Sequence, residues 1–310
     1  MGMLWRGSHK FKGYTQFLAG VTGIFPERGN GKVFWVNGES GDNDNLPGTN
    51  PDKPLLTIGA ALALCTNYAH DIVCVTNYSS QAQAVETWPI PVTVHQVHIV
   101  GVGHKGDKMV TVHATGTNKS AFLVTGNRVE LANLEIAGKS GGSGAGVLVG
   151  DASGNGWGCY IHDCWFSVPR APGASCANGV YVASGYDAPY LRIEDCEFTN
   201  ALTAAAILIA GNATRGTIAN NSFMQCTCAI SVTGGAVSLK IFDNKIYMDA
   251  DTSGHGIALG ASTSGCFITG NQAAVTESKP SAGYAFVDAT TNANAWGINY
   301  SGSTAVLVAG

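Results

Sequence analysis

Short stretches in which apolar and polar residues alternate recur along the chain between about residues 120 and 290. Apolar side chains at every second position indicate β-strands with one buried face. Each stretch follows a small residue, and no amphipathic helical segment lies between successive stretches. The predicted strands are 121–124, 146–149, 179–182, 206–209, 229–232, 256–259 and 284–287.

A second set of predicted strands lies between the first, and its members repeat a common pattern. Each has an apolar residue, two spacers and then an anchor residue, usually with another apolar residue two positions later. The anchors are position 133 or 134, then Cys164, Cys196, Asn221, Asn244 and Asn271. A propeller blade would need about 40 residues and hairpin turns, which the pattern lacks. Two or three short strands per repeat, with no helix between them, predict a right-handed parallel β-helix with turns about 4.8 Å apart.

The anchors predict one inward column of the β-helix. Asn221, Asn244 and Asn271 should stack as a ladder in which each amide bonds to the next turn. Cys164 and Cys196 fall in the same column, where a cysteine behaves as a small buried hydrophobic residue. This assigns two of the nine cysteines a packing role rather than a redox role.

Residues 33–77 differ from the repeats. They read as a strand, an Asp/Asn/Gly turn, a proline-bounded loop, a short apolar helix capped by Thr57, and a second strand. The end of a β-helix exposes an unpaired strand edge that must be covered to prevent strand addition. We expect the helix to lie across that end.

This opening and the repeats after it resemble the pectate-lyase-like superfamily of right-handed β-helix proteins. The resemblance covers roughly residues 33–290 and implies an all-β, single-stranded right-handed parallel β-helix with an N-terminal capping helix. It implies a cap at 33–77, repeats over about 78–290 and a C-terminal cap at 291–310. The superfamily includes lyases, hydrolases, phage tailspikes and virion proteins, so the resemblance indicates fold more than activity.

Residues 1–32 do not fit the repeat and are expected to form an extended arm. Aromatic and basic residues alternate there among glycines that interrupt any helix. Such a segment is poorly suited to folding alone and well suited to ordering on a partner. The candidate docking residues are Trp5, Arg6, Lys10, Phe11, Lys12, Tyr14, Phe17 and Phe25.

Composition narrows the function further. The chain has 310 residues, of which 45% are hydrophobic and only 12% charged, and its net charge of −4 gives no reason to expect nucleic-acid binding. No apolar run is long enough for a membrane span, and the first residues lack the apolar segment of a secretory signal. No CxxC pair occurs among the nine cysteines. We therefore expect reduced thiols and no cofactor.

The best match to catalytic chemistry is Gly254-His255-Gly256, which resembles one motif of the polygalacturonase-type hydrolases. That family's pair of aspartates would lie one turn earlier, where this chain has Gln225-Cys226-Thr227-Cys228. Its other motifs are absent as well. The missing partners favour a surface histidine at a strand start and argue against this chemistry.

One column of carboxylates remains as an alternative catalytic set. Asp163 and Asp195 precede successive anchors, with Asn220 and Asp243 at the equivalent positions of later turns. In register the first two would lie about 5 Å apart, a spacing that suits a retaining glycosidase. The same residues also suit Asx-turns that bind backbone N–H groups. The turn interpretation is favoured, and Asp163, Asp195 and His255 stay as the alternative catalytic residues.

A candidate metal site lies in the turn that contains Asp42, Asp44 and Asn45. These oxygen ligands would suit Ca²⁺, but the loop lacks the bidentate glutamate at its twelfth position. A solvated turn is the favoured interpretation.

Together these features predict a non-enzymatic structural subunit of a bacteriophage particle, either a capsid decoration protein or a small spike. The arm would anchor it to capsid or tail proteins, and the chain would form a homotrimer located in virions assembled in the host cytoplasm. The alternative is a polysaccharide-degrading or glycan-binding tailspike that contacts a cell-surface glycan. Neither a nucleic acid nor a membrane is expected as a partner.

Overall fold

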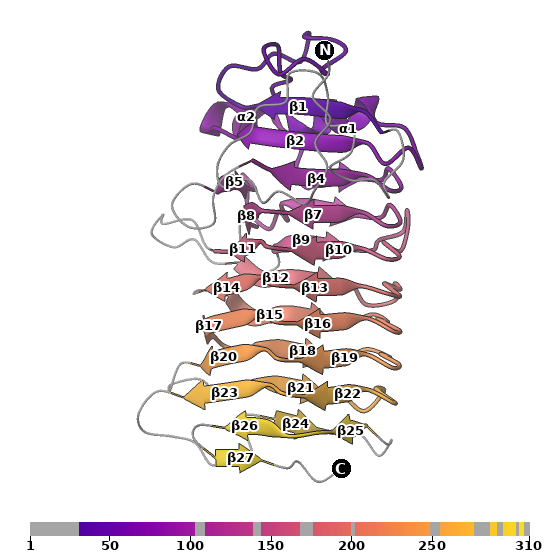
Figure 1. Ribbon diagram of the computed structural model, residues 1–310, viewed down its shortest axis with the longest axis vertical. Helices are drawn as coiled ribbons and strands as arrows, with labels where there is room; N and C mark the ends of the chain where they lie inside the picture. The colour runs from indigo at the N-terminus through magenta and orange to yellow at the C-terminus, as the bar shows by residue number, and fades with distance from the viewer. Residues whose placement is uncertain are drawn as a thin grey trace, which may run out of the picture.

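The computed structural model describes residues 31–102, 109–138, 144–167, 176–199, 202–248, 255–275, 286–289, 294–301 and 304–306. Over these residues the chain winds as a right-handed solenoid of short strands, with the N-terminal turns at one end and the C-terminal turns at the other (Figure 1). The predicted all-β parallel β-helix is confirmed.

Successive turns contribute strands to three sheets, in which strand pairing is parallel up to the last pair. Sheet 1 contains β1 (Val33–Asn37), β2 (Ile72–Asn77), β4 (His98–Gly101), β7 (Glu130–Ala132), β10 (Tyr160–His162), β13 (Arg192–Glu194), β16 (Thr217–Ala219), β19 (Lys240–Phe242), β22 (Phe267–Thr269) and β25 (Ala295–Trp296). Sheet 2 contains β5 (Val110–His113), β8 (Leu134–Ala137), β11 (Trp165–Phe166), β14 (Glu197–Thr199), β17 (Ser222–Cys226), β20 (Lys245–Met248), β23 (Gln272–Val275), β26 (Asn299–Ser301) and β27 (Thr304–Val306). Sheet 3 contains β3 (Ile90–Val92), β6 (Phe122–Val124), β9 (Ala145–Val149), β12 (Cys176–Val182), β15 (Leu202–Ile209), β18 (Ile230–Val232), β21 (Ile257–Leu259) and β24 (Phe286–Asp288).

The core lies inside the solenoid, where the apolar members of each alternating strand stack in columns. In sheet 2 the rings of Phe166, Phe198 and Phe223 stack with centroids 4.6 Å and 4.9 Å apart. Interplanar angles of 4° and 9° make the rings nearly parallel. In-register pairing thus turns a sequence repeat into a continuous core.

The anchor column is also as predicted. Asn221, Asn244 and Asn271 are fully buried, and the Nδ2 of each donates to the Oδ1 of the next amide, at 3.0 Å and 2.8 Å for the first two steps. A fourth member, Asn299, extends the ladder and accepts from Asn271 at 3.0 Å. In the earlier turns Cys164 and Cys196 replace asparagine.

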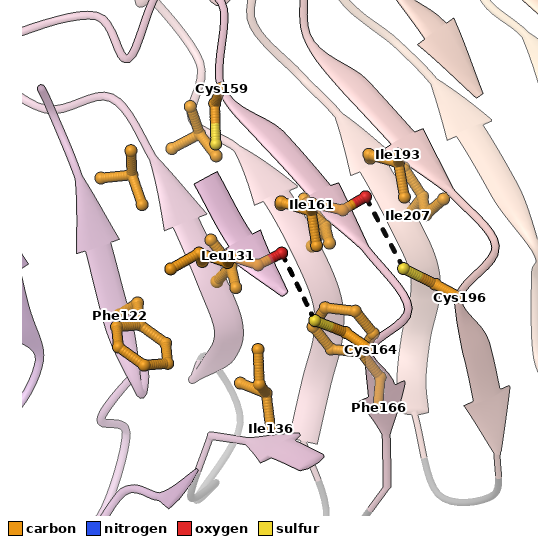
Figure 2. Close-up of a cluster of buried hydrophobic side chains, with 14 of the residues drawn as sticks. Phe122, Leu131, Ile136, Cys159, Ile161, Cys164, Phe166, Ile193, Cys196 and Ile207 are labelled. Atoms are coloured by element: carbon orange, nitrogen blue, oxygen red, sulfur yellow. Dashed lines mark hydrogen bonds between the residues drawn. The ribbon is translucent and has the colours of Figure 1, made fainter. Parts of the chain in front are cut away.

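The two cysteines of this column donate to carbonyl oxygens of the preceding turn. Cys164 Sγ lies 3.6 Å from the Leu131 oxygen and Cys196 Sγ lies 3.7 Å from the Ile161 oxygen (Figure 2). All nine cysteines are free; Cys65 and Cys228 are half-buried and the others are buried. The expectation of thiols without disulfides holds.

Helix α1 (Ile58–Leu64) packs against the first turns, at the N-terminal end of the solenoid, where it contacts β1, β2 and β3, and its Ile58, Ala61 and Leu62 are buried. Thr57 is its N-cap, with a hydroxyl that accepts from the Ala60 amide at 3.2 Å. The sequence did not predict a second short helix, α2 (Ser80–Val85), near the same end. No helix in the described ranges has the length and apolar character needed to cross a membrane.

The arm proposed for residues 1–32 lies almost entirely outside the described residues, because the description starts at residue 31. The candidate docking residues of that arm, from Trp5 to Phe25, therefore stay a prediction.

Candidate functional site

The outer face of sheet 1 brings together polar residues that are about 30 positions apart in sequence. Strand pairing places Glu130, Tyr160 and Arg192 in one outward row. A second outward row contains His162 and Glu194. Because paired strands lie about 4.8 Å apart, each of these side chains can contact its neighbours in the turns above and below.

Glu130 is the centre of a continuous hydrogen-bonded chain on this face. Its Oε2 lies 2.5 Å from His98 Nδ1, and its Oε1 lies 2.8 Å from His162 Nε2. His162 Nδ1 in turn lies 2.8 Å from Asp163 Oδ2, and His70 Nδ1 lies 3.2 Å from His98 Nε2. This series of hydrogen bonds therefore runs from His70, through Glu130, to the exposed carboxylate of Asp163 at the edge of sheet 1.

The hydrogen bonds of this series change the pKa of His162. Burial alone would lower the pKa of His162, but the hydrogen bonds to Glu130 and Asp163 outweigh it and raise the pKa. The protonated imidazole is thus favoured between its two carboxylate neighbours. Glu130 is only 5% exposed, and its two carboxylate oxygens lie within hydrogen-bond distance of His98 on one side and His162 on the other.

Beside this chain lies a second group built from Tyr160, Arg192 and Glu194. Arg192 binds Glu194 through two nitrogens, at 3.0 Å and 2.7 Å, and its guanidinium lies 4.2 Å from the Tyr160 ring centroid. The Tyr160 hydroxyl donates to Glu194 at 3.2 Å. Burial, followed by the charge of Glu194, raises the pKa of Tyr160 to about 12. The ring of Tyr160 also stacks on His162, with centroids 4.2 Å apart, so the two groups form one surface.

Asp163 and Asp195 lie at the edge where the chain leaves sheet 1. Both have left-handed backbone conformations, with φ of 52° and 54°, as do Asn133, Asn220 and Asp243 at equivalent positions. Aspartate and asparagine tolerate this conformation better than most residues. The structure thus places the two aspartates in successive turns, where their residue type suits the turn.

The structure does not bring His255 to these aspartates. His255 precedes strand β21 of sheet 3, three turns along the solenoid from Asp163, and its backbone oxygen accepts from the Ala229 amide at 3.2 Å. Ile257 and Leu259 after it are buried. The proposed catalytic trio is therefore not assembled in one place.

Asp42 and Asp44 lie in a compact turn in which the Asp44 amide donates to Asp42 Oδ1 at 3.0 Å. Asn45 bonds through its side chain to the Pro54 oxygen at 3.0 Å. Within the part of the chain that the structure describes, no group of three or more His, Cys, Asp or Glu residues is arranged to hold a metal ion.

The opposite edge of sheet 1, where the chain enters the strands, carries exposed aromatic residues. Trp157 and Tyr190 are 39% and 44% exposed, and their ring centroids are 6.0 Å apart. Backbone bonds hold these turns together: the Gly158 amide donates to the Pro189 oxygen at 2.8 Å. We call this edge the aromatic edge; it consists of Arg128, Trp157, Tyr190 and Arg215.

Asp163 was predicted from the sequence, but the aromatic edge and the other residues hydrogen-bonded in series around Glu130 were not. The alternation of buried and exposed positions could have located these residues. Tyr160, Arg192 and Glu194 point outward from strands whose inward residues are isoleucine. Reading the outward columns as well as the inward ones would have placed these residues side by side.

Comparison with known proteins bears on the fold. The family model described as "Right handed beta helix region" matches residues 97–306. Among solved structures, the native GH136 lacto-N-biosidase from Eubacterium ramulus is similar with a TM-score of 0.53 at 14% identity, covering 87% of this chain and 56% of that one. Its selenomethionine derivative matches with a TM-score of 0.38 at 13% identity, covering 88% of this chain and 68% of that one. The chain thus spans little more than half the length of the native enzyme, and no curated protein sequence matches it.

Proposed function

The chain belongs to the right-handed β-helix family, and we propose that it binds a glycan on the outer face of sheet 1. The observation that carries the proposal is the exposed pair Trp157 and Tyr190, which lies at the edge of a face rich in hydrogen-bonding groups. Exposed aromatic rings provide flat apolar surfaces on which the C–H face of a sugar can stack. The neighbouring carboxylates, imidazoles and guanidinium can bond to hydroxyl groups.

Binding without cleavage is the proposal that the charges support. Hydrolysis by a carboxylate pair needs one acid and one base or nucleophile free to face the glycosidic bond. On this face Glu130 is held between two imidazoles and Glu194 is held by Arg192. Asp163 remains more accessible, with a side chain 55% exposed, and contributes a hydrogen-bonding group at the far edge.

The test is a glycan array probed with the wild-type protein and two alanine variants. Trp157→Ala should lose the signals that the wild type gives. Phe267→Ala is the matched control, because Phe267 is 45% exposed on the same sheet but lies four turns from Trp157. Absence of any wild-type signal, or equal loss in both variants, would overturn the proposal.

A second candidate function is favoured by the sequence of residues 1–32. We propose that this aromatic and basic segment anchors the chain, as a homotrimer, to capsid or tail proteins of a bacteriophage particle in the virion. The low charged fraction of 12% suits subunits that bury their flanks in an assembly. Deletion of residues 1–32 should leave a folded β-helix that no longer joins its particle. Retained assembly, or a monomer in light scattering of the full chain, would contradict this role.

A further inference from the structure

The aromatic edge carries two cations that its turns do not neutralise. Arg128 places its guanidinium 5.4 Å from the Trp157 ring centroid. Arg215 lies 6.0 Å from the Tyr190 ring centroid and donates to the Tyr190 hydroxyl at 2.9 Å. The four side chains therefore form a row in the order arginine, tryptophan, tyrosine, arginine across successive turns.

Neither arginine makes an ion pair with a carboxylate of the described residues, in contrast to Arg192. The carboxylates carried by the same edge turns are engaged elsewhere. Asp151 accepts from the Ser153 amide at 2.7 Å and from its hydroxyl at 2.6 Å. Asp187 accepts from Asn212 Nδ2 at 2.6 Å. The edge thus presents two positive charges whose contacts are mainly with aromatic rings.

The backbone shows that these side chains occupy positions where glycine would fit at least cost. Arg128, Tyr190 and Arg215 have φ of 55°, 60° and 57°, in the left-handed region. Gly158 and Gly265 occupy the equivalent positions of other turns, two residues before their strands. A residue with a side chain costs about 1 kcal/mol or more in this conformation. The fold requires the turn geometry but not the large side chains.

From this row we infer that the glycan bound at sheet 1 is anionic, and that its carboxylate or sulfate groups bind Arg128 and Arg215 while its rings stack on Trp157 and Tyr190. This inference rests on the proposed glycan-binding function and adds the chemical class of the ligand. Guanidinium groups bind carboxylates and sulfates through paired N–H donors. A guanidinium that already lies near an aromatic face is partly desolvated and needs less reorganisation to bind an anion.

The test compares two pairs of polymers that differ only in charge: alginate against carboxyl-reduced alginate, and dextran sulfate against dextran. Binding is measured by biolayer interferometry with the full chain at two salt concentrations. We expect at least one anionic member to bind roughly tenfold or more tightly than its neutral counterpart, the size of effect that a charge-assisted hydrogen bond gives. Binding should weaken as salt rises, because exposed charges are screened.

Variants separate this inference from the proposed function. Arg128→Gln and Arg215→Gln should each weaken anionic binding roughly five- to tenfold and leave any neutral binding unchanged. Lys245→Gln is the matched control, since it removes one positive charge from the outer face of sheet 2. Carboxylate-specific and sulfate-specific outcomes both support the inference and identify the anion.

Three outcomes would overturn the inference. If neutral and anionic members bind equally and Trp157→Ala abolishes both, glycan binding stands and anionic selectivity fails. If Lys245→Gln weakens anionic binding as much as the arginine variants do, the attraction is general and the row is not the site. If no polymer and no arrayed glycan binds, both proposals fail.

Discussion

The asparagine ladder gives a sharp prediction for stability, because one buried side chain links three turns. Asn244 Oδ1 accepts from the backbone N and from Nδ2 of Asn221, each at 3.0 Å. Its own Nδ2 lies 2.8 Å from Asn271 Oδ1, 3.0 Å from the Ile218 oxygen and 3.1 Å from the Phe242 oxygen. Asn244 is fully buried, so water cannot replace these partners.

The magnitude for Asn244→Ala follows from these contacts. The oxygen accepts two bonds and the amide has two protons, so truncation removes about four hydrogen bonds, each worth about 1 kcal/mol net. The Asn221 backbone N–H also loses its side-chain acceptor. We expect a loss of about 3–5 kcal/mol, a large part of the roughly 5–15 kcal/mol that keeps a typical domain folded.

The assay is urea unfolding followed by far-UV circular dichroism, combined with hydrogen exchange on strands β16 and β19. Exchange is needed because a solenoid can open locally, turn by turn. Asn244→Cys should lose less stability, since Cys164 and Cys196 fill the same column and donate to carbonyls through Sγ. The exposed Asn220→Asp is the control and should be nearly neutral. A loss below about 1 kcal/mol for Asn244→Ala would refute the ladder's energetic role.

Three further predictions concern titration and thiol chemistry. The pKa of His162 is raised above 6.5 by its hydrogen bonds to Glu130 and Asp163. The stabilisation that the protonated imidazole gives is therefore complete below pH 6.5 and is lost as the pH rises through the raised pKa. The urea midpoint should fall more between pH 6 and pH 9 in the wild type than in His162→Gln. Burial alone would raise the pKa of Glu135, but neighbouring His113 and hydrogen bonds from Ser167 and Thr111 outweigh it and lower the pKa to about 2. That contribution is present above pH 4.5 and lost as the pH falls toward 2, so Ser167→Ala should narrow the stability difference between pH 7 and pH 2. Burial raises the pKa of Cys65, Cys74, Cys159 and Cys226 to about 12 and that of Cys228 to about 11, so thiol modification at pH 8 should be slow throughout. Because Cys65 and Cys228 are half-buried and the other seven are buried, a thiol reagent should modify at most these two before unfolding; rapid modification of all nine would contradict the packing.

Much of the fold could be predicted from the sequence because the core residues of a β-helix recur once per turn along the chain. In-register stacking places the same type of residue at the same point of every turn, and the column from Cys164 to Asn271 shows this directly. The helix α1 was predictable from its cap at Thr57. Helix α2 was missed because its six residues, SQAQAV, give too short a pattern to separate a helix from a loop.

The candidate site was harder to predict for a physical reason. Outward positions are not constrained by packing, so no repeated residue type marks them. Glu130 and His162 are 32 positions apart and meet only because β7 and β10 pair in register. His255 belongs to a short Gly-His-Gly match to a hydrolase motif, but the turn before it lacks the aspartates with which that motif acts.

The central claim is that a glycan lies against the aromatic edge of sheet 1, and oxidative footprinting of the full chain tests it most directly. A glycan selected on the array, at saturating concentration, should protect Trp157 and Tyr190 from hydroxyl-radical modification. Tyr247 and Phe267, which are 42% and 45% exposed elsewhere on the solenoid, should be modified at unchanged rates. Unchanged modification of Trp157 and Tyr190 at saturation, or protection of Tyr247 and Phe267 instead, would contradict the claim.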